Sequence, residues 1–212
     1  MNGKDYLLST AYFPPLHYIW LISTADRILI EHHENYLKQS YRNRCQIASA
    51  NGMLSLSIPV LEGSFRKISV SEVGIDYSRR WREVHTGAIE SSYRAAPYFD
   101  FYYDRIRKII EGKHDRLIDL NSLALSEILK ILGIETPVIP TSSFRKPVSE
   151  TGDFRYLISP KKPLEKQAFS FAQYIQVFSD RFGFMPGLSI LDLIFNTGPD
   201  AAGILKKTAC SC

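Results

Sequence analysis

The chain has 212 residues, of which 45% are hydrophobic, 23% charged and 12% aromatic, a composition typical of a folded globular protein and not of a disordered one. Its 26 basic and 22 acidic residues give a net charge of +4 and are interspersed, without the dense basic stripe of a nucleic-acid-binding domain. No apolar run approaches the ~20 residues of a membrane-spanning helix and no signal-peptide pattern follows Met1, so we expect a cytoplasmic protein without a membrane span or a nucleic-acid partner.

The first thirty residues predict a βαβ unit. Residues 6–12 form an apolar stretch that ends at Pro14 and Pro15, as a buried strand does, because proline cannot continue a β-ladder. Apolar residues recur at helical spacing from Leu16, and the fixed φ of the preceding proline suits a helix start. Residues 28–30 then predict a second strand. A strand, helix and strand within about 30 residues have the usual size of a βαβ unit.

The middle of the chain predicts a hairpin followed by helices. Asn51 and Gly52 tolerate the positive φ of a tight turn, so we expect strands at residues 45–48 and 54–60 on either side of them. Helical spacing of apolar residues then predicts helices over residues 81–93, 97–110 and 119–132; Asn121 or Ser122 is the candidate cap of the last helix, and Gly133 ends it.

The chain therefore has the pattern of an α/β protein. We expect a mixed sheet opened by the βαβ unit, flanking helices and a small, mostly helical C-terminal region, all in one folding unit. Residues 1–140 would form the α/β core, and the Pro- and Gly-containing residues 141–170 an irregular linker, covering loop or mobile flap. Residues 171–212 would form an extension packed on the core.

The end of the first predicted strand is one candidate site. Ligands of open α/β sheets bind beyond the carboxyl ends of the strands, where a helix N-terminus offers free N–H groups to an anion. Tyr12 and Pro14 lie at this end, and His17 lies in the first turn of the helix that follows. His17 either moves a proton in this crevice or packs in the core.

Four consecutive residues, Glu31 to Glu34, raise the question of a metal ion. Adjacent residues of a strand point to opposite faces, so His32 and His33 cannot easily bind the same ion. A pair formed by Glu31 and His33, a lone general base, and a solvated strand end remain as alternatives. We assign no metal ligand and no cofactor to the chain.

The densest basic cluster follows at residues 38–44. If this segment is extended, Lys38, Arg42 and Arg44 share one face, because side chains two residues apart lie on the same side of a strand. Arginine can grip a phosphate or carboxylate with two hydrogen bonds, whereas lysine supplies a point charge. The cluster predicts an anion-binding site, in which Asn43 would orient a hydroxyl or carbonyl group; a solvated basic loop is the alternative.

The predicted helix at residues 81–93 supplies another candidate site. Trp81 and His85 are four residues apart and therefore share a helical face, where they can form an aromatic wall with His85 as an acid or base. Tyr93 ends the same helix. Core packing is the competing interpretation for Trp81 and Tyr93.

Taken in order, these segments resemble the WbqC-like family. The resemblance rests on residues spread over most of the chain: Tyr12-Phe13-Pro14, Ala25-Asp26, Lys38 to Arg44, Gly52, Ile58-Pro59-Val60, Trp81, His85, Tyr93, Ala96-Pro97-Tyr98-Phe99, Leu120-Asn121, Leu132-Gly133-Ile134, Leu188-Ser189-Ile190-Leu191-Asp192 and Gly198-Pro199. Many family members have a Gln-Pro pair where this chain has Thr10-Ala11.

The resemblance implies a role in bacterial surface polysaccharide (O-antigen-like) biosynthesis, because members of the family are associated with such gene clusters. We expect a transferase that acts on a nucleotide-linked or carrier-linked sugar, or that transfers an acyl or aminoacyl group to it. His17 or His85 would move the proton. The substrate would be bound by Tyr12, Pro14, Lys38, Arg42, Asn43, Arg44, Trp81 and Tyr93. The alternative is a non-catalytic accessory or scaffold protein of the same pathway, with an exposed aromatic patch and no concave pocket.

Overall fold

The structure, a computed structural model, describes residues 4–61, 67–144, 146, 152–162 and 169–210. The predicted βαβ unit is confirmed: β1 (Asp5–Ser9) and β2 (Arg27–Glu31) pair in parallel and are joined by α1 (Leu16–Thr24). A third strand, β5 (Val138–Pro140), joins β2 in parallel and completes a sheet of order β1-β2-β5. The carboxyl ends of all three strands therefore lie at one edge of this sheet.

The predicted hairpin forms a sheet of its own. Strands β3 (Arg44–Ser49) and β4 (Gly52–Ser57) pair antiparallel, and Gly52 has a φ of 97°, a conformation that glycine adopts without steric cost. The α/β class is confirmed, with the parallel strands and this antiparallel pair in separate sheets. Buried Cys45 and Ile47 place one face of the hairpin in the core.

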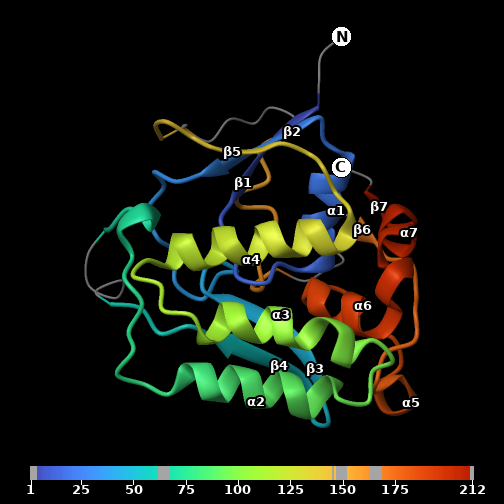
Figure 1. Ribbon diagram of the computed structural model, residues 1–212. Helices are drawn as coiled ribbons and strands as arrows, with labels where there is room; N and C mark the ends of the chain where they lie inside the picture. Colours follow the sequence, from blue (N-terminus) through green and yellow to red (C-terminus); the bar gives the residue numbers. More distant parts are fainter. Residues whose placement is uncertain (1–3, 62–66, 145, 147–151, 163–168, 211–212) are drawn as a thin grey trace.

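Three helices lie in a row between the parallel sheet and the far side of the molecule (Figure 1). They are α2 (Trp81–Tyr93), α3 (Phe99–Glu111) and α4 (Leu117–Leu132). In Figure 1, α4 lies nearest the parallel sheet and α2 farthest from it, and α2 also contacts β3. The start predicted for α4 is wrong: Leu117 and Ile118 are buried in its first turn, so Asn121 and Ser122 lie inside the helix and do not cap it.

The C-terminal region packs beside α1. It contains the short 3₁₀ segment η3 (Gly198–Asp200), the helices α5 (Ser179–Phe182), α6 (Ile190–Thr197) and α7 (Ala201–Lys206), and the pair β6 (Phe169–Ser170) with β7 (Ala209–Cys210). Another 3₁₀ segment, η1 (Val70–Glu72), precedes α2 in the chain and contacts α4. Both α6 and α7 contact α1, so the region covers the helix of the βαβ unit.

Two segments far apart in the sequence hold one another at the start of α1. Phe13 has a φ of 35°, in the left-handed region that bulky residues rarely adopt. Ser189 donates a hydrogen bond from Oγ to the carbonyl oxygen of Phe13 (2.8 Å), and the N–H of Ile190 donates to the carbonyl oxygen of Pro14 (2.9 Å). These contacts fix the chain between β1 and α1.

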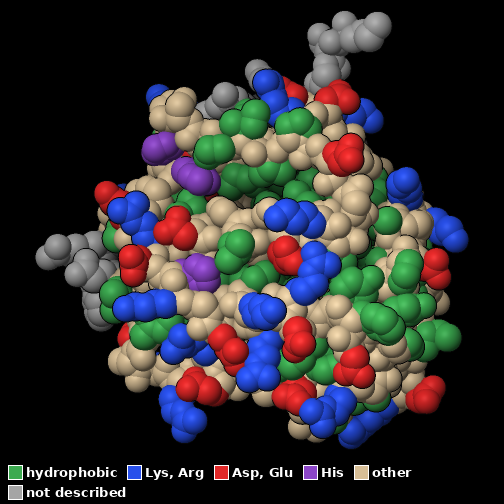
Figure 2. Space-filling model, viewed as in Figure 1, with side chains coloured by type: hydrophobic (Ala, Val, Ile, Leu, Met, Phe, Trp, Pro, Cys, Tyr) green, Lys and Arg blue, Asp and Glu red, His purple; other side chains and the backbone are tan. Residues whose placement is uncertain are grey.

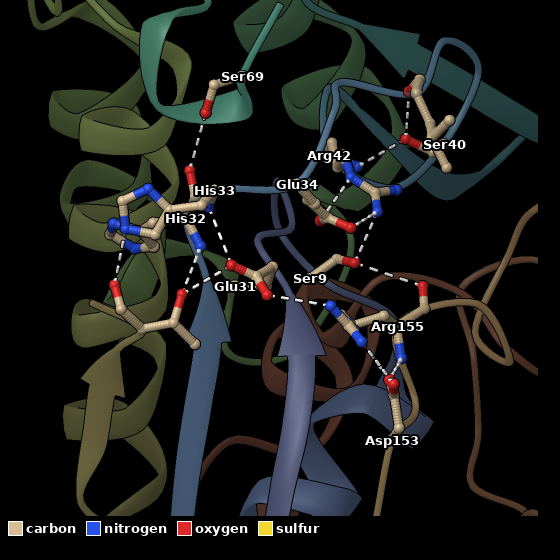
Figure 3. Close-up of polar contacts among 12 residues, drawn as sticks. Ser9, Glu31, His32, His33, Glu34, Ser40, Arg42, Ser69, Asp153 and Arg155 are labelled. Carbon is tan, nitrogen blue, oxygen red and sulfur yellow. Dashed lines mark hydrogen bonds and ion pairs between the residues drawn. The ribbon is translucent and has the colours of Figure 1, made fainter. Parts of the chain in front are cut away.

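Residues 152–154, in the middle of the segment 141–170, lie along the outer edge of β1. The N–H of Leu7 donates to the carbonyl oxygen of Gly152 (2.7 Å). The N–H of Phe154 donates to the carbonyl oxygen of Leu7 (2.9 Å). This contact brings Asp153 and Arg155 to the carboxyl edge of the parallel sheet (Figure 3). Residues 145, 147–151 and 163–168 of the predicted loop or flap lie outside the described residues. Among the described helices, none has both the length and the apolar character that crossing a bilayer requires.

Candidate functional site

A basic cleft of about 730 Å³ lies between the loop that precedes β3, the strand β4 and the start of α2. It is lined by Tyr36, Lys38, Gln39, Asn43, Arg44, Leu54, Ser55, Leu56, Ser57, Ile58, Pro59, Val60, Asp76, Arg79, Arg80, Trp81, Val84, His85 and Ala88. Five of the candidate residues are among them, namely Lys38, Asn43, Arg44, Trp81 and His85. The structure therefore brings the basic cluster and the aromatic face of α2 to one place, although they are about 40 residues apart in sequence.

The cleft is strongly positive. Four of its lining side chains are cationic, Lys38, Arg44, Arg79 and Arg80, and among the described lining residues only Asp76 is acidic. The first residue of α2 also lines the cleft, so the positive end of the helix dipole adds to these charges. The arrangement favours an anionic ligand, because cationic side chains and helix N-termini are the usual partners of phosphate groups.

Sequence reasoning missed Arg79 and Arg80. Both are exposed, and both immediately precede α2. The signal that points to them is a pair of arginines directly before a helix start, where an anion would meet side-chain and backbone donors together.

Asn43 and Arg44 are fixed by the end of β4. Arg44 lies opposite Ser57 in the hairpin, and its Nε donates a hydrogen bond to Ser57 Oγ (3.0 Å). Asn43 donates from Nδ2 to the carbonyl oxygen of Ile58 (2.8 Å). Within the described part of the chain, Asn43 Oδ1 and Trp81 Nε1 have no hydrogen-bond partner. Two side chains that line the cleft thus each keep a buried polar atom without a partner among the described residues, and such an atom is costly.

His85 forms part of the wall together with a tyrosine behind it. The His85 ring lies 5.2 Å from that of Trp81, and its Nδ1 lies 3.0 Å from the hydroxyl oxygen of Tyr12, which is fully buried. Burial lowers the pKa of His85 to about 4, with a smaller opposing effect from a hydrogen bond with the Ser57 backbone. Burial also raises the pKa of Tyr12. At neutral pH the pair is therefore a neutral imidazole and a protonated phenol.

This burial predicts a loss of stability in acid. The pKa of His85 falls from 6.5 to about 4 on folding, so between these values the unfolded chain binds more protons than the folded one. Stability is fully present above pH 6.5 and falls as the pH is lowered to about 4, by roughly 3 kcal/mol in total. Urea unfolding at neutral pH and near pH 4 measures it, and His85→Gln should lose about 3 kcal/mol less than the wild type over the same interval. Equal losses in both proteins would contradict the burial of a neutral imidazole.

Arg42 does not reach the cleft. Its Nε donates to Glu34 Oε1 (2.9 Å), and its Nη2 contacts Glu34 Oε2 (2.6 Å) and Ser9 Oγ (2.7 Å). The predicted shared face for Lys38, Arg42 and Arg44 is wrong, because the residues between Lys38 and Arg44 form turns and no strand. Arg42 is only 3% exposed and points inward, whereas Lys38 is exposed.

A buried charge network occupies the carboxyl edge of the parallel sheet (Figure 3). Glu31, the last residue of β2, accepts hydrogen bonds from Arg155 Nη1 (3.0 Å) and Thr141 Oγ1 (2.7 Å). Arg155 Nη2 pairs with Asp153 Oδ2 (2.6 Å), and the side chains of Glu31 and Arg155 are 0% exposed. Sequence reasoning did not find Arg155, because it lies in the irregular segment where periodicity gives no information.

The same network bears on the metal hypothesis. Glu31 Oε1 also accepts a hydrogen bond from the backbone N–H of His33 (3.0 Å), and His33 Nε2 lies 3.1 Å from the carbonyl oxygen of Thr141. Glu31 and His33 are therefore engaged by protein groups. Among the described residues, no group of three or more His, Cys, Asp or Glu side chains is placed to hold a metal ion.

Three other candidate residues lie away from the cleft. His17 is fully buried, with its ring centroid 5.0 Å from that of Phe169. Tyr93 is also fully buried, and its hydroxyl accepts a hydrogen bond from the N–H of Ala48 (3.0 Å). Pro14 is buried at the start of α1. These positions hold the core together around the βαβ unit and the hairpin.

Two comparisons with known proteins match most of the chain. An uncharacterized protein of Mycobacterium tuberculosis, Rv1507c, is 27% identical over 230 residues, which cover 96% of this chain and 97% of that protein. No solved structure matches the chain. The model of the WbqC-like protein family matches residues 10–162, a span that includes every residue lining the basic cleft. The chain belongs to the WbqC-like protein family.

Proposed function

We propose that the protein is an enzyme of bacterial surface polysaccharide biosynthesis that holds an activated sugar, or a carrier-bound acyl or aminoacyl group, in the basic cleft. The convergence of four cationic side chains and a helix N-terminus on one cleft carries the proposal. Membership of the WbqC-like family supports the choice of pathway. A volume of about 730 Å³ lies within the usual ~300–1,000 Å³ of small-molecule sites.

The positive wall would bind the phosphate groups of the activated substrate. Arg44, Arg79 and Arg80 carry planar guanidinium groups that can donate two parallel hydrogen bonds to a phosphate, and Lys38 adds a point charge. Asn43 Oδ1 and Trp81 Nε1 would bind hydroxyl groups of the sugar. In this proposal the phosphate-binding and hydroxyl-binding groups would share one cleft, as recognition of a sugar phosphate requires.

His85 would accept a proton during group transfer. In transfer of an acyl or aminoacyl group to a sugar, a sugar hydroxyl or amine attacks the activated carbonyl, loses a proton and expels the carrier. A pKa of about 4 makes His85 a weak base in the empty cleft. A bound phosphate would raise that pKa, because a nearby negative charge favours the imidazolium form. The Tyr12 hydroxyl, 3.0 Å from Nδ1, would hold the ring in place for this role.

A non-catalytic accessory role is the second candidate. It predicts an exposed aromatic patch without a concave pocket, whereas Trp81 is only 4% exposed and lines a concave cleft with Lys38 and Arg44. His17 is not among the residues that line the cleft and packs against Phe169 instead. The cleft therefore favours ligand binding over a purely structural partner surface.

A thermal-shift screen of the wild-type protein tests the proposal. The panel contains UDP-, GDP-, dTDP- and CMP-linked sugars and acyl-carrier conjugates, with free sugars as controls. A ligand present at about 100 times its Kd stabilises the native state by roughly 2.7 kcal/mol, which raises the Tm of a chain of this size by roughly 5–10 °C. At least one activated substrate should do so while its free sugar does not. No shift with any member of the panel would refute the proposal.

A further inference from the structure

A second, smaller basic pocket lies beside the loop of residues 37–42, which also borders the cleft. Its volume is about 150 Å³, and it is lined by Leu37, Lys38, Gln39, Ser40, Arg42, Arg155, Tyr156, Ile158, Ser159 and Lys161. Lys38 and Gln39 line the basic cleft as well, so the two sites are neighbours separated by this loop. We call it the inner pocket.

The inner pocket combines cations with hydroxyl groups. Lys38, Arg42, Arg155 and Lys161 line it, and none of its described lining residues is acidic. The carboxylates of Glu31, Glu34 and Asp153 bind the two guanidinium groups without lining the pocket. They therefore fix the arginines in position, while Ser40 and Ser159 add hydroxyl groups to the wall.

One nitrogen of the Arg42 guanidinium makes no hydrogen bond to the described residues. Glu34 and Ser9 engage Nε and Nη2, and no hydrogen bond among the described residues uses Nη1. Figure 3 shows the third nitrogen directed away from Glu34 and Ser9. Arg42 is only 3% exposed and lines the inner pocket, so Nη1 is the guanidinium nitrogen left to meet an anion there. A hydrogen bond from a charged guanidinium to an anion is stronger than one between neutral groups.

The backbone of the shared loop supports a binding role. Gln39 has a φ of 53°, in the left-handed region that residues other than glycine seldom adopt. Such conformations cluster at ligand sites, where the surrounding structure holds them in place. Gln39 lines both the cleft and the inner pocket, so this conformation shapes the wall between them.

We propose that the inner pocket is a separate binding site for a phosphate or diphosphate group. Its volume of about 150 Å³ corresponds to roughly five water molecules, which suits a small oxyanion and excludes a nucleotide. The Arg42 guanidinium, with Lys38 and Lys161 beside it, would supply charge-assisted hydrogen bonds to such an anion, while Arg155, bound to Glu31 and Asp153, adds positive charge to the wall. This site does not depend on the function proposed for the cleft.

Figure 2 shows a competing hollow elsewhere on the surface, with hydrophobic side chains in its depth and histidines at one end. A groove of about 450 Å³ lies between α4 and the strands β2 and β5, lined by His32, Ile30 and Leu129 among others. It holds one cation, Lys130, and one acid, Glu135. The groove therefore lacks the positive charge that recognises phosphate, and the inner pocket is the stronger site for an anion.

Calorimetric titration of the full-length protein with inorganic pyrophosphate tests the inference. Lys161→Gln should weaken pyrophosphate binding by about tenfold or more, because it removes one charge-assisted contact. Lys162→Gln is the matched control: this exposed lysine is next in the chain, carries the same charge and lies outside the pocket lining. Lys38→Gln should weaken binding as well, whereas Arg44→Gln, which alters the cleft alone, should not.

The variants separate this inference from the proposed function. Absence of pyrophosphate binding to the wild type overturns the inner site, and so does equal weakening by Lys161→Gln and Lys162→Gln. Weakening by Arg44→Gln but not by Lys161→Gln would place the anion in the cleft and also overturn it. A failed screen of activated sugars, with pyrophosphate binding intact and sensitive to Lys161→Gln, would refute the function of the cleft and leave the inner site standing.

Discussion

Replacement of Arg155 by methionine is expected to lower the free energy of unfolding by about 3–5 kcal/mol. Arg155 pairs with Glu31 at 3.0 Å and with Asp153 at 2.6 Å, and at most 5% of any of these three side chains is exposed. The substitution leaves two buried carboxylates without their cation, and the low dielectric of the interior makes an uncompensated charge costly. Urea unfolding monitored by circular dichroism measures the change.

Arg107→Met is the matched control for this prediction. Arg107 also pairs with a carboxylate, Glu111, at 2.7 Å, but the two side chains are 50% and 48% exposed. Loss of an exposed ion pair changes stability by only ~0–1 kcal/mol. Adding Glu31→Gln and Asp153→Asn to Arg155→Met should restore much of the loss, because it removes the unpaired charges. A loss in Arg155→Met no larger than in Arg107→Met would contradict the buried network.

Local sequence signals predicted most of the fold. The Asn-Gly turn and the spacing of apolar residues on α2 act within a few residues, and the predicted and observed bounds of α2 are the same. The end predicted for the first strand, at residue 12 before the prolines, is wrong, because β1 ends at Ser9. The start of α4 was missed because Arg116 makes no capping hydrogen bond with its side chain, so burial of Leu117 and Ile118 determines the boundary. The parallel pairing of β5 with β2 joins residues more than 100 positions apart, which periodicity does not encode.

The residues of the candidate site were predicted as two separate groups. Lys38, Asn43 and Arg44 were identified from charge, and Trp81 and His85 from helical spacing, yet nothing in the sequence showed that the two groups meet. They meet because α2 packs against β3 of the hairpin that Arg44 begins. Convergence of this kind depends on tertiary packing, which a local pattern does not contain.

Arg42 shows the limit of pattern arguments for side-chain direction. A period of two residues places side chains on one face only in an extended chain. The segment forms turns instead, and the buried pair of Glu34 and Ser9 draws Arg42 inward. Arg155, its neighbour in the inner pocket, comes from a segment without any periodicity, so only its place in the structure identifies it.

Removal of two cationic side chains from the cleft should lower the affinity for its ligand by roughly two to four orders of magnitude. Lys38 and Arg44 line the cleft on the side of the loop, and each charge-assisted contact contributes ~1.5–3 kcal/mol to binding. The double variant Lys38→Gln, Arg44→Gln therefore loses about 3–6 kcal/mol where the two effects add. Neither side chain is buried in the core, so the fold should be retained. Arg105→Gln with Arg107→Gln removes the same charge from α3, outside the cleft lining.

The most direct test of the cleft is calorimetric titration of the activated sugar that gives the largest thermal shift into three proteins: the wild type, the Lys38 and Arg44 double variant, and the Arg105 and Arg107 double variant. Our interpretation predicts that the Arg105 and Arg107 variant binds like the wild type. It also predicts that the Lys38 and Arg44 variant binds at least ~100-fold more weakly. Equal affinities in the two double variants would contradict an anion-binding role for the cleft.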